Sequence, residues 1–156
     1  MILHPQKLFL PRLWLLLAIF CSSTAACSEQ GSRNKVCFQR ECVTVEIADT
    51  DQKRERGLQN RQFLGRREGM LFIFAQNGRY SFWMKDTLIP LDMIWLDDSR
   101  RVVYVAANVP PCRSEPCPVY TPPYEARYVL ELNAGMAQKL GLHPGSQVQF
   151  WLNKVQ

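Results

Sequence analysis

The sequence has 156 residues and a formal net charge of +5 at pH 7, because its 19 lysines and arginines outnumber its 14 aspartates and glutamates. The basic residues between Lys53 and Arg67 are interspersed with acids, which is typical of a solvated surface; contact with anionic head groups or glycans is the alternative. Of the two histidines, only His143 follows the N-terminal segment. This scarcity excludes a multi-histidine metal site and leaves histidine-dependent catalysis with a single residue in an expected turn.

The first 26 residues have the features of an export signal. Lys7 and Arg12 precede the apolar run 13–21, and small residues follow at 22–26. The run is shorter than the ~20 apolar residues with which a helix crosses a membrane. We therefore predict a cleaved signal peptide over residues 1–26. Export makes nucleic acid an unexpected partner for the mature chain.

Cys27 is the candidate site of a lipid anchor. Residues 23–27 resemble a lipobox, with Thr24 where such signals usually have leucine. In an oxidising compartment the five cysteines from Cys27 onward would leave one thiol unpaired, whereas lipidation of Cys27 leaves an even set. We predict a lipid anchor on Cys27, a tether over residues 27–35 and a place on the periplasmic side of a bacterial cell envelope. A soluble periplasmic or secreted protein is the alternative.

A single domain is predicted over residues 36–156. Val43, Val45 and Ile47 alternate with polar residues, which predicts a half-buried strand. Oxygens at residues 49–51 can cap a helix over 52–59, and Gly141 can end a helix over 134–140. Further strands are predicted over 69–74, 80–84, 91–96 and 101–106, and, after a proline-rich loop, over 127–132 and 147–152. These elements indicate an α+β fold: a mostly antiparallel sheet, curled or barrel-like, with two short helices on its rim or on one face.

Four cysteines form two pairs with the same spacing. Cys37 and Cys42 lie five residues apart, as do Cys112 and Cys117. A two-residue turn at 39–40 would place Cys37 opposite Cys42 within disulfide range, and the second pair would pin the proline-rich loop. We predict two local structural disulfides; a redox or metal pair would use tighter spacing or added histidines.

Four motifs occur in order along the chain, at residues 56–58 (RGL), 69–72 (GMLF), 82–92 (FWMKDTLIPLD) and 128–135 (YVLELNAG). Together they make the chain, over roughly residues 43–152, resemble the Domain of Unknown Function 192 family. Asp86 stands where that family commonly has asparagine, and residues 59–60 stand where it commonly has an apolar residue. The resemblance implies a compact single domain that is often exported, and it supplies no established activity, substrate or catalytic residue.

Asp92 is the residue of this run whose chemistry is most constrained. Alternation over 91–96 places Asp92 on the same strand face as Ile94 and Leu96. If that face is inward, the carboxylate is buried and must be paired or hydrogen-bonded. The expected partners are Lys85, Arg56 and the backbone amides of residues 86–87.

Two interpretations of the run remain open. In one, Asp92 braces a loop and the aromatic side chains fill the core. In the other, a cleft for a ligand is lined by Trp83, Lys85, Asp86, Thr87 and Asp92, because an apolar surface with a few convergent polar groups is typical of ligand sites.

The function that these features favour is a non-enzymatic envelope lipoprotein that binds a small ligand, a glycan or an envelope protein, with no cofactor and no metal. The alternative is an envelope hydrolase with paired carboxylates, Asp86 and Asp92, which would have to share one accessible cleft. A third class, a structural lipoprotein without a ligand, would bury Trp83 in the core.

Overall fold

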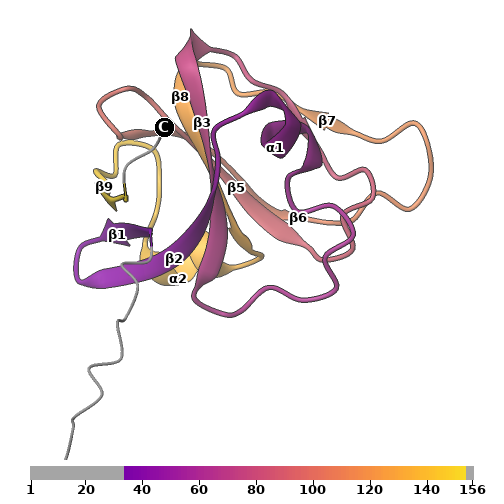
Figure 1. Ribbon diagram of the computed structural model, residues 1–156, viewed down its shortest axis with the longest axis horizontal. Helices are drawn as coiled ribbons and strands as arrows, with labels where there is room; N and C mark the ends of the chain where they lie inside the picture. The colour runs from indigo at the N-terminus through magenta and orange to yellow at the C-terminus, as the bar shows by residue number, and fades with distance from the viewer. Residues whose placement is uncertain (1–33, 154–156) are drawn as a thin grey trace, which may run out of the picture.

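The computed structural model describes residues 34–153. The predicted signal peptide, Cys27 and nearly all of the predicted tether lie outside these residues. The described chain forms a seven-stranded sheet, a two-stranded sheet and two short helices (Figure 1). The large sheet contains β1 (Lys35–Phe38), β2 (Glu41–Ala48), β3 (Glu68–Gly78), β5 (Leu91–Leu96), β6 (Val102–Val109), β8 (Ala126–Asn133) and β9 (Gln149–Trp151). The small sheet pairs β4 (Phe82–Trp83) with β7 (Val119–Tyr120), and the helices are α1 (Asp51–Arg56) and α2 (Met136–Leu140).

The large sheet is curled. Its strand order is β6-β5-β8-β3-β2-β1-β9, and every neighbouring pair is antiparallel except β2 with β3. At one end the two edges of this order meet: Arg101 forms a bridge with Gln147, and the Val102 amide donates to the Ser146 carbonyl at 2.9 Å. The β-rich, curled half-barrel with two short helices agrees with the predicted architecture, in which sheet dominates.

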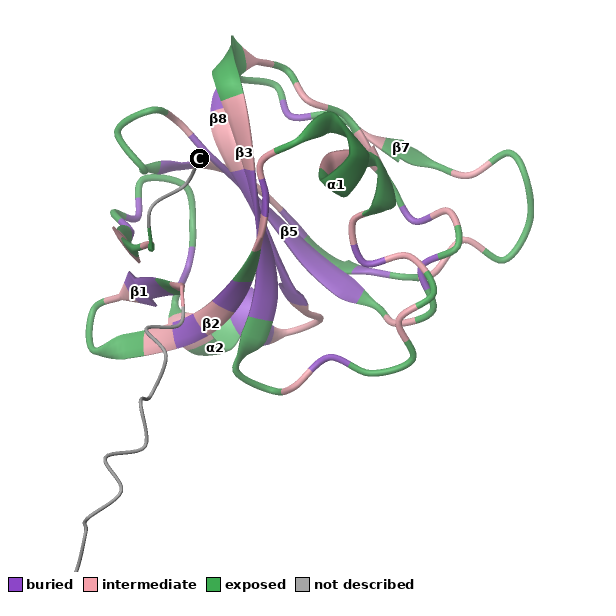
Figure 2. Cartoon of the chain, in the orientation of Figure 1, coloured by how far each residue is buried: buried purple, intermediate pink, exposed green. Residues whose placement is uncertain are grey.

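The sheet buries side chains on both faces. Inside the curl, Leu71, Ile94 and Leu130 pack with residues from both sheet edges, which only a curled sheet can bring together. On the outer face, Phe72 and Trp95 belong to a second core, covered by the segment after α1 and by the β4–β7 region. All six residues of β5 are buried, as Figure 2 shows along its length. Because alternate residues of one strand enter different cores, the outer face offers a second place for a site.

Several predicted elements have different bounds in the structure. The strand predicted over 80–84 contracts to β4, and its partner β7 lies in the proline-rich loop, where no strand was predicted. Helix α1 is capped by Thr50, one of the three residues predicted to cap it, whose Oγ1 accepts from the Lys53 amide at 3.3 Å. Helix α2 starts at Met136, and Gly141 ends it in the left-handed conformation that the sequence predicted for a C-cap.

Disulfides join Cys37 to Cys42 and Cys112 to Cys117, the pairs that the spacing indicates. Cys37 lies directly opposite Cys42 in the β1–β2 hairpin, with a Cα–Cα distance of 4.1 Å. The hairpin register follows from a two-residue turn, as the sequence analysis expects. The second disulfide closes the tip of the loop before β7.

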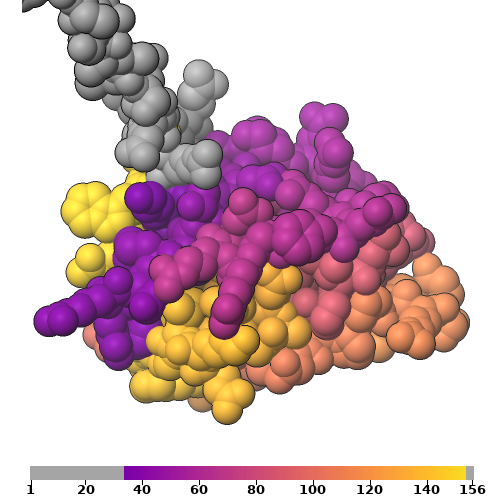
Figure 3. Space-filling model, turned by 90° about the horizontal axis from the view of Figure 1, so that it is seen from below, coloured from indigo at the N-terminus to yellow at the C-terminus, as the bar shows by residue number. Residues whose placement is uncertain are grey.

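The two ends of the described chain lie together. Strands β1 and β9 pair antiparallel, and the Asn153 amide donates to the Asn34 side chain at 2.8 Å. Figure 3 shows the first and last described segments side by side on this surface. Between residues 34 and 153, no helix has the length and apolar character needed to cross a membrane.

Candidate functional site

A pocket opens on the outer face of the sheet, between α1, the start of the following loop, β4 and β8. It encloses about 300 Å³, including solvent-open space at its mouth. Its walls come from segments that are far apart in the sequence. They are Arg54, Glu55, Arg56, Gly57, Leu58, Gln59, Phe72, Phe82, Trp83, Lys85, Thr87 and Glu131.

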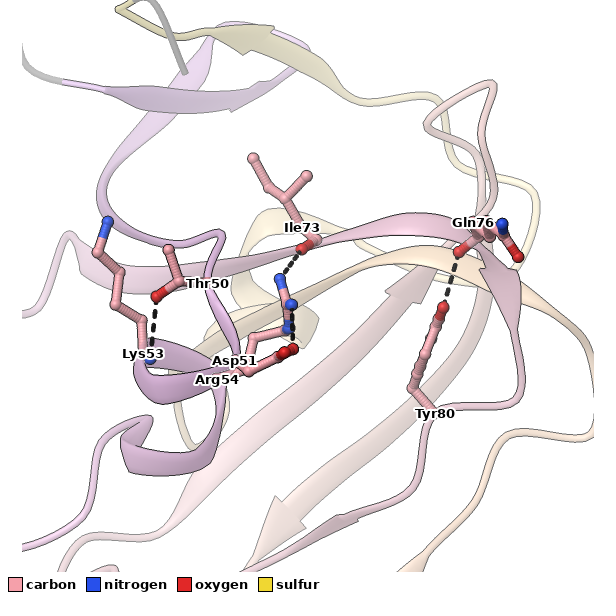
Figure 4. Close-up of polar contacts among 7 residues, drawn as sticks. All are labelled: Thr50, Asp51, Lys53, Arg54, Ile73, Gln76 and Tyr80. Carbon is pink, nitrogen blue, oxygen red and sulfur yellow. Dashed lines mark hydrogen bonds and ion pairs between the residues drawn. The ribbon is translucent and has the colours of Figure 1, made fainter. Parts of the chain in front are cut away.

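Helix α1 is held against β3 by Arg54, which fixes one side of the pocket. The Arg54 guanidinium donates from Nη1 to the Ile73 carbonyl at 2.7 Å and from Nη2 to Asp51 at 2.6 Å (Figure 4). The helix ends at Gly57, whose φ of +46° few side chains adopt, and a Cβ there would lie 3.3 Å from the Phe72 ring. The short helix and its tight end therefore bring α1 close to the aromatic wall.

Three of the five residues that the sequence analysis assigned to a cleft line this pocket. They are Trp83, Lys85 and Thr87. The Trp83 side chain is 49% exposed, so it is not part of the core. Lys85 Nζ lies 5.6 Å from the centre of the Trp83 ring and pairs with Glu115 at 3.0 Å. The hydrogen bond to Glu115 raises the pKa of Lys85, so this side chain is a cation at neutral pH.

Asp86 does not line the pocket. It is exposed and has a φ of +54°, a left-handed conformation that aspartate and asparagine tolerate better than most residues. Its carbonyl accepts from the Asn60 amide at 2.7 Å. The role that the structure gives Asp86 is therefore to shape the turn after β4 and to join it to the loop after α1.

Asp92 lies in the core on the other face of the sheet, and the predicted partners Lys85, Arg56 and the backbone amides of residues 86–87 are wrong. Its Oδ2 accepts from the Ala137 amide in the first turn of α2, and its Oδ1 accepts from the Asn108 amide, both at 2.7 Å. The Asn108 amide points at Asp92 because β6 has a bulge opposite this residue. Asp92 therefore braces α2 and β6, as the first interpretation holds.

The burial of Asp92 bears on the paired-carboxylate hypothesis. Asp92 is 0% exposed, whereas Asp86 lies at the surface. The two carboxyl groups therefore do not share an accessible cleft, which the hydrolase mechanism built on them requires.

Glu131, which the sequence analysis did not single out, is the carboxyl group of the pocket. It lies opposite Met70 and Met93 in the sheet and is 4% exposed. Among residues 34–153 it has no hydrogen-bond or ion-pair partner, and burial raises its pKa to about 8. The pattern that indicated Asp92 also applies to Glu131, because alternation places Glu131 on the same strand face as the apolar residue Val129.

The charged side chains at the mouth of the pocket are of both signs. Arg56 is exposed and has no ion-pair partner in the described part of the chain, and Lys85 is half-exposed beside Trp83. Glu55 is the acid on the same side. A pocket with charged side chains at its mouth, an aromatic wall and a buried carboxyl group offers polar contacts at two depths.

No metal site is evident in the described residues. Between residues 34 and 153, no group of three or more His, Cys, Asp or Glu side chains is arranged to hold a metal ion. His143 is exposed in the turn before β9, as predicted, where its ring lies beside the Pro144 carbonyl.

The curled sheet and its pocket define a small β-rich domain with a pocket on the outer face of its sheet. The model of the DUF192 family, described as uncharacterized ACR, matches residues 34–150, and the chain belongs to this family, as the four motifs predicted. A UPF0127 protein from Thermococcus gammatolerans is 32% identical over 108 residues, which cover 68% of this chain. The match covers 65% of that protein, so the chain spans less than two thirds of this relative's length.

Two solved structures share the fold. A candidate transcription regulator from Sinorhizobium meliloti 1021 is 32% identical, with a TM-score of 0.69 over 76% of this chain and 92% of that one. A protein of unknown function from Novosphingobium aromaticivorans DSM 12444 is 34% identical, with a TM-score of 0.68 over 75% of this chain and 83% of that one.

Proposed function

We propose that this protein is a lipid-anchored module of the bacterial cell envelope that binds a small ligand, without catalysing a reaction, in the pocket between α1 and β8. The observation that carries the proposal is Glu131, a buried carboxyl group without a partner among the described residues, in a pocket whose mouth bears Trp83. The Glu131 side chain lines the pocket, so a ligand that enters the pocket can reach its carboxyl group. A hydrogen bond from a ligand supplies the missing partner, and perturbed groups in pockets are typical of functional sites.

The exposure of Trp83 supports a ligand site over a purely structural role. A large aromatic side chain at a pocket mouth offers apolar contact area that a ligand can cover. Trp95, by contrast, is fully buried and donates its indole N–H to the Tyr80 carbonyl at 2.9 Å. Trp95 is therefore part of the core, whereas Trp83 has exposed surface that a ligand can cover.

The test is native mass spectrometry of the protein purified gently from its own host. We expect a bound molecule on the wild-type protein, and a smaller bound fraction on the Trp83→Ala variant. Trp151→Ala is the matched control, because Trp151 is 64% exposed and lies on β9, outside the pocket. Equal retention by Trp83→Ala and by wild type would place the bound molecule elsewhere and contradict the proposed site.

The envelope location rests on the sequence of residues 1–27. A basic start, a short apolar run and small residues before Cys27 support export and lipidation. A Cys27→Ser variant should lose the diacylglyceryl mass and leave the membrane fraction. Wild-type protein that is already soluble and unmodified would refute the anchor.

A hydrolase is the second candidate, because a carboxyl group that is protonated at neutral pH is the form that a general acid needs. Glu131 meets this requirement, and Glu55 lines the same pocket. An enzyme would turn over an envelope glycan, and Glu131→Gln would abolish turnover while retaining binding. Binding by wild type without any turnover supports the non-enzymatic proposal.

A further inference from the structure

The proposed ligand pocket has three parts with different chemistry. Its deepest polar group is Glu131, its wall includes Phe82, and its mouth carries Trp83, Arg56 and Lys85. Each part restricts the ligand in a different way, and together they indicate a ligand class.

The buried end favours a hydroxyl group over a cation. At pH 7 the Glu131 carboxyl is mostly protonated, because burial raises its pKa to about 8. A protonated carboxyl both donates and accepts a hydrogen bond, as a hydroxyl does, so the two can satisfy each other. An ammonium group would instead require the charged carboxylate in the place where burial disfavours it.

The charged groups that line the pocket include one arginine without an ion pair in the described residues. Those that line it besides Glu131 are Arg54, Glu55, Arg56 and Lys85. Arg54 is engaged with Asp51 and the Ile73 carbonyl, whereas Arg56 has no ion-pair partner in residues 34–153. Lys85 is paired with Glu115, so Arg56 is the lining cation without an ion-pair partner in residues 34–153, and an anionic group of a ligand can pair with it.

The aromatic surface favours a ring with an apolar face. Phe82 packs edge-on against Phe72 and Trp95, with ring centres 4.9 and 5.7 Å apart, so its position is fixed by the core. Trp83 is the neighbouring residue and is half-exposed. Lys85 lies beside the Trp83 ring, so an anionic group that meets Lys85 brings the rest of the ligand next to the indole.

We infer that the pocket binds an acidic sugar: a pyranose ring whose hydroxyl groups bond to Glu131, whose C–H face lies on the aromatic surface at Trp83, and whose carboxylate lies beside Arg56 and Lys85. This ligand class rests on the proposed binding function and adds its chemistry.

The test uses four small probes and the indole N–H signals of the protein in two-dimensional NMR. The probes are glucuronate, glucose, glucosamine and cyclohexanecarboxylate, which separate the contributions of the carboxylate, the hydroxyl groups and the charge. In the described residues the indoles are Trp83, Trp95 and Trp151, so one signal reports on the pocket and one, from Trp151, is an exposed control. We expect glucuronate to shift the Trp83 signal saturably, with the other three probes weaker and Trp151 unmoved.

Variants assign the contacts. Arg56→Gln should weaken glucuronate binding about two- to fivefold, as for an exposed ion pair, and leave glucose binding unchanged. Arg66→Gln is the control, because Arg66 is exposed and lies outside the pocket. Trp83→Phe should keep part of the affinity, and Trp83→Ala should lose about two- to tenfold.

The pH dependence tests the buried contact separately. Glucuronate stays anionic across the range, so its affinity for wild type should fall as the pH rises through about 8, where Glu131 loses its proton. Glu131→Gln keeps a donor and an acceptor, and should bind at pH 7 with an affinity that does not change between pH 7 and 9.

Two results would overturn the ligand class. Tighter binding of glucosamine or glucose than of glucuronate at Trp83 would refute the acidic sugar and leave the binding function standing. No shift of Trp83 with glucuronate would also refute it. If, in addition, the natively purified protein retains no molecule, the binding function fails as well.

Discussion

Glu131 is predicted to make the folded protein less stable as the pH rises from about 5 to 8. Its pKa rises from 4.5 to about 8 on folding because burial penalises the charged form. Between these two values the unfolded chain releases the proton and the folded chain keeps it, so raising the pH favours the unfolded state. The contribution of Glu131 to stability is therefore fully present below the pKa of the unfolded chain. It falls as the pH rises and is lost once the pH has passed the pKa of the folded chain.

The size of the effect follows from the shift. Each unit of pKa difference corresponds to about 1.4 kcal/mol, so Glu131 alone should lower the free energy of unfolding by about 3 kcal/mol between pH 5 and pH 8. Glu131→Gln has no proton to release and should not show this loss. The difference in unfolding free energy between variant and wild type should thus grow in favour of the variant as the pH rises.

Urea denaturation at pH 5, 6, 7 and 8 measures the effect. Glu55→Gln is the matched control, because Glu55 lines the same pocket but is exposed. We expect the stability curve of Glu55→Gln to run parallel to that of wild type. A Glu131→Gln curve that also runs parallel to wild type would refute the account, since Glu131 would then titrate alike in the folded and unfolded chains.

Three further predictions concern the scaffold. Asp92→Ala leaves one buried and one partly buried backbone amide without an acceptor and should lower the free energy of unfolding by about 2 to 4 kcal/mol, with Asp92→Asn losing less. An unchanged urea midpoint for the alanine variant contradicts the bracing role. Gly69→Ala should lower the free energy of unfolding by about 1 to 3 kcal/mol, because the added Cβ would lie 2.4 Å from the Glu131 carbonyl oxygen. A melting temperature equal to that of wild type would show that the two strands can move apart at this position. Replacing Cys112 and Cys117 by serine should lower the free energy of unfolding by about 1 to 3 kcal/mol. Peptide mapping of the wild-type protein without reductant should recover these two cysteines as a pair. A wild-type melting temperature for the double variant would show that the disulfide does not stabilise the loop.

The elements that the sequence predicts well are those with strong local patterns. The predicted strand 91–96 has the bounds of β5, because its apolar run is bounded by Pro90 and a turn at Asp97–Asp98. The cysteine hairpin also follows from local spacing. Strand β7 has no such pattern, because it is two residues long and is defined by pairing with β4 across the proline-rich loop.

The candidate site shows where a local pattern stops being informative. Alternation correctly predicted that Asp92 is buried. Its partners, Asn108 and Ala137, are 16 and 45 residues away, and their positions depend on a bulge in β6 and on the packing of α2. Glu131 follows the same alternation on β8, yet only the sheet register shows that it faces the core opposite to that of Asp92. Trp83, Lys85 and Thr87 were found because they lie close together in the sequence.

The most direct test of the account is a crystal structure of the protein with the molecule that it retains from its native host. We predict a polar atom of that molecule about 2.6 to 3.2 Å from the Glu131 carboxyl, with a flat face of the molecule over the Trp83 ring. A retained molecule bound elsewhere, with this pocket holding water alone, would contradict it.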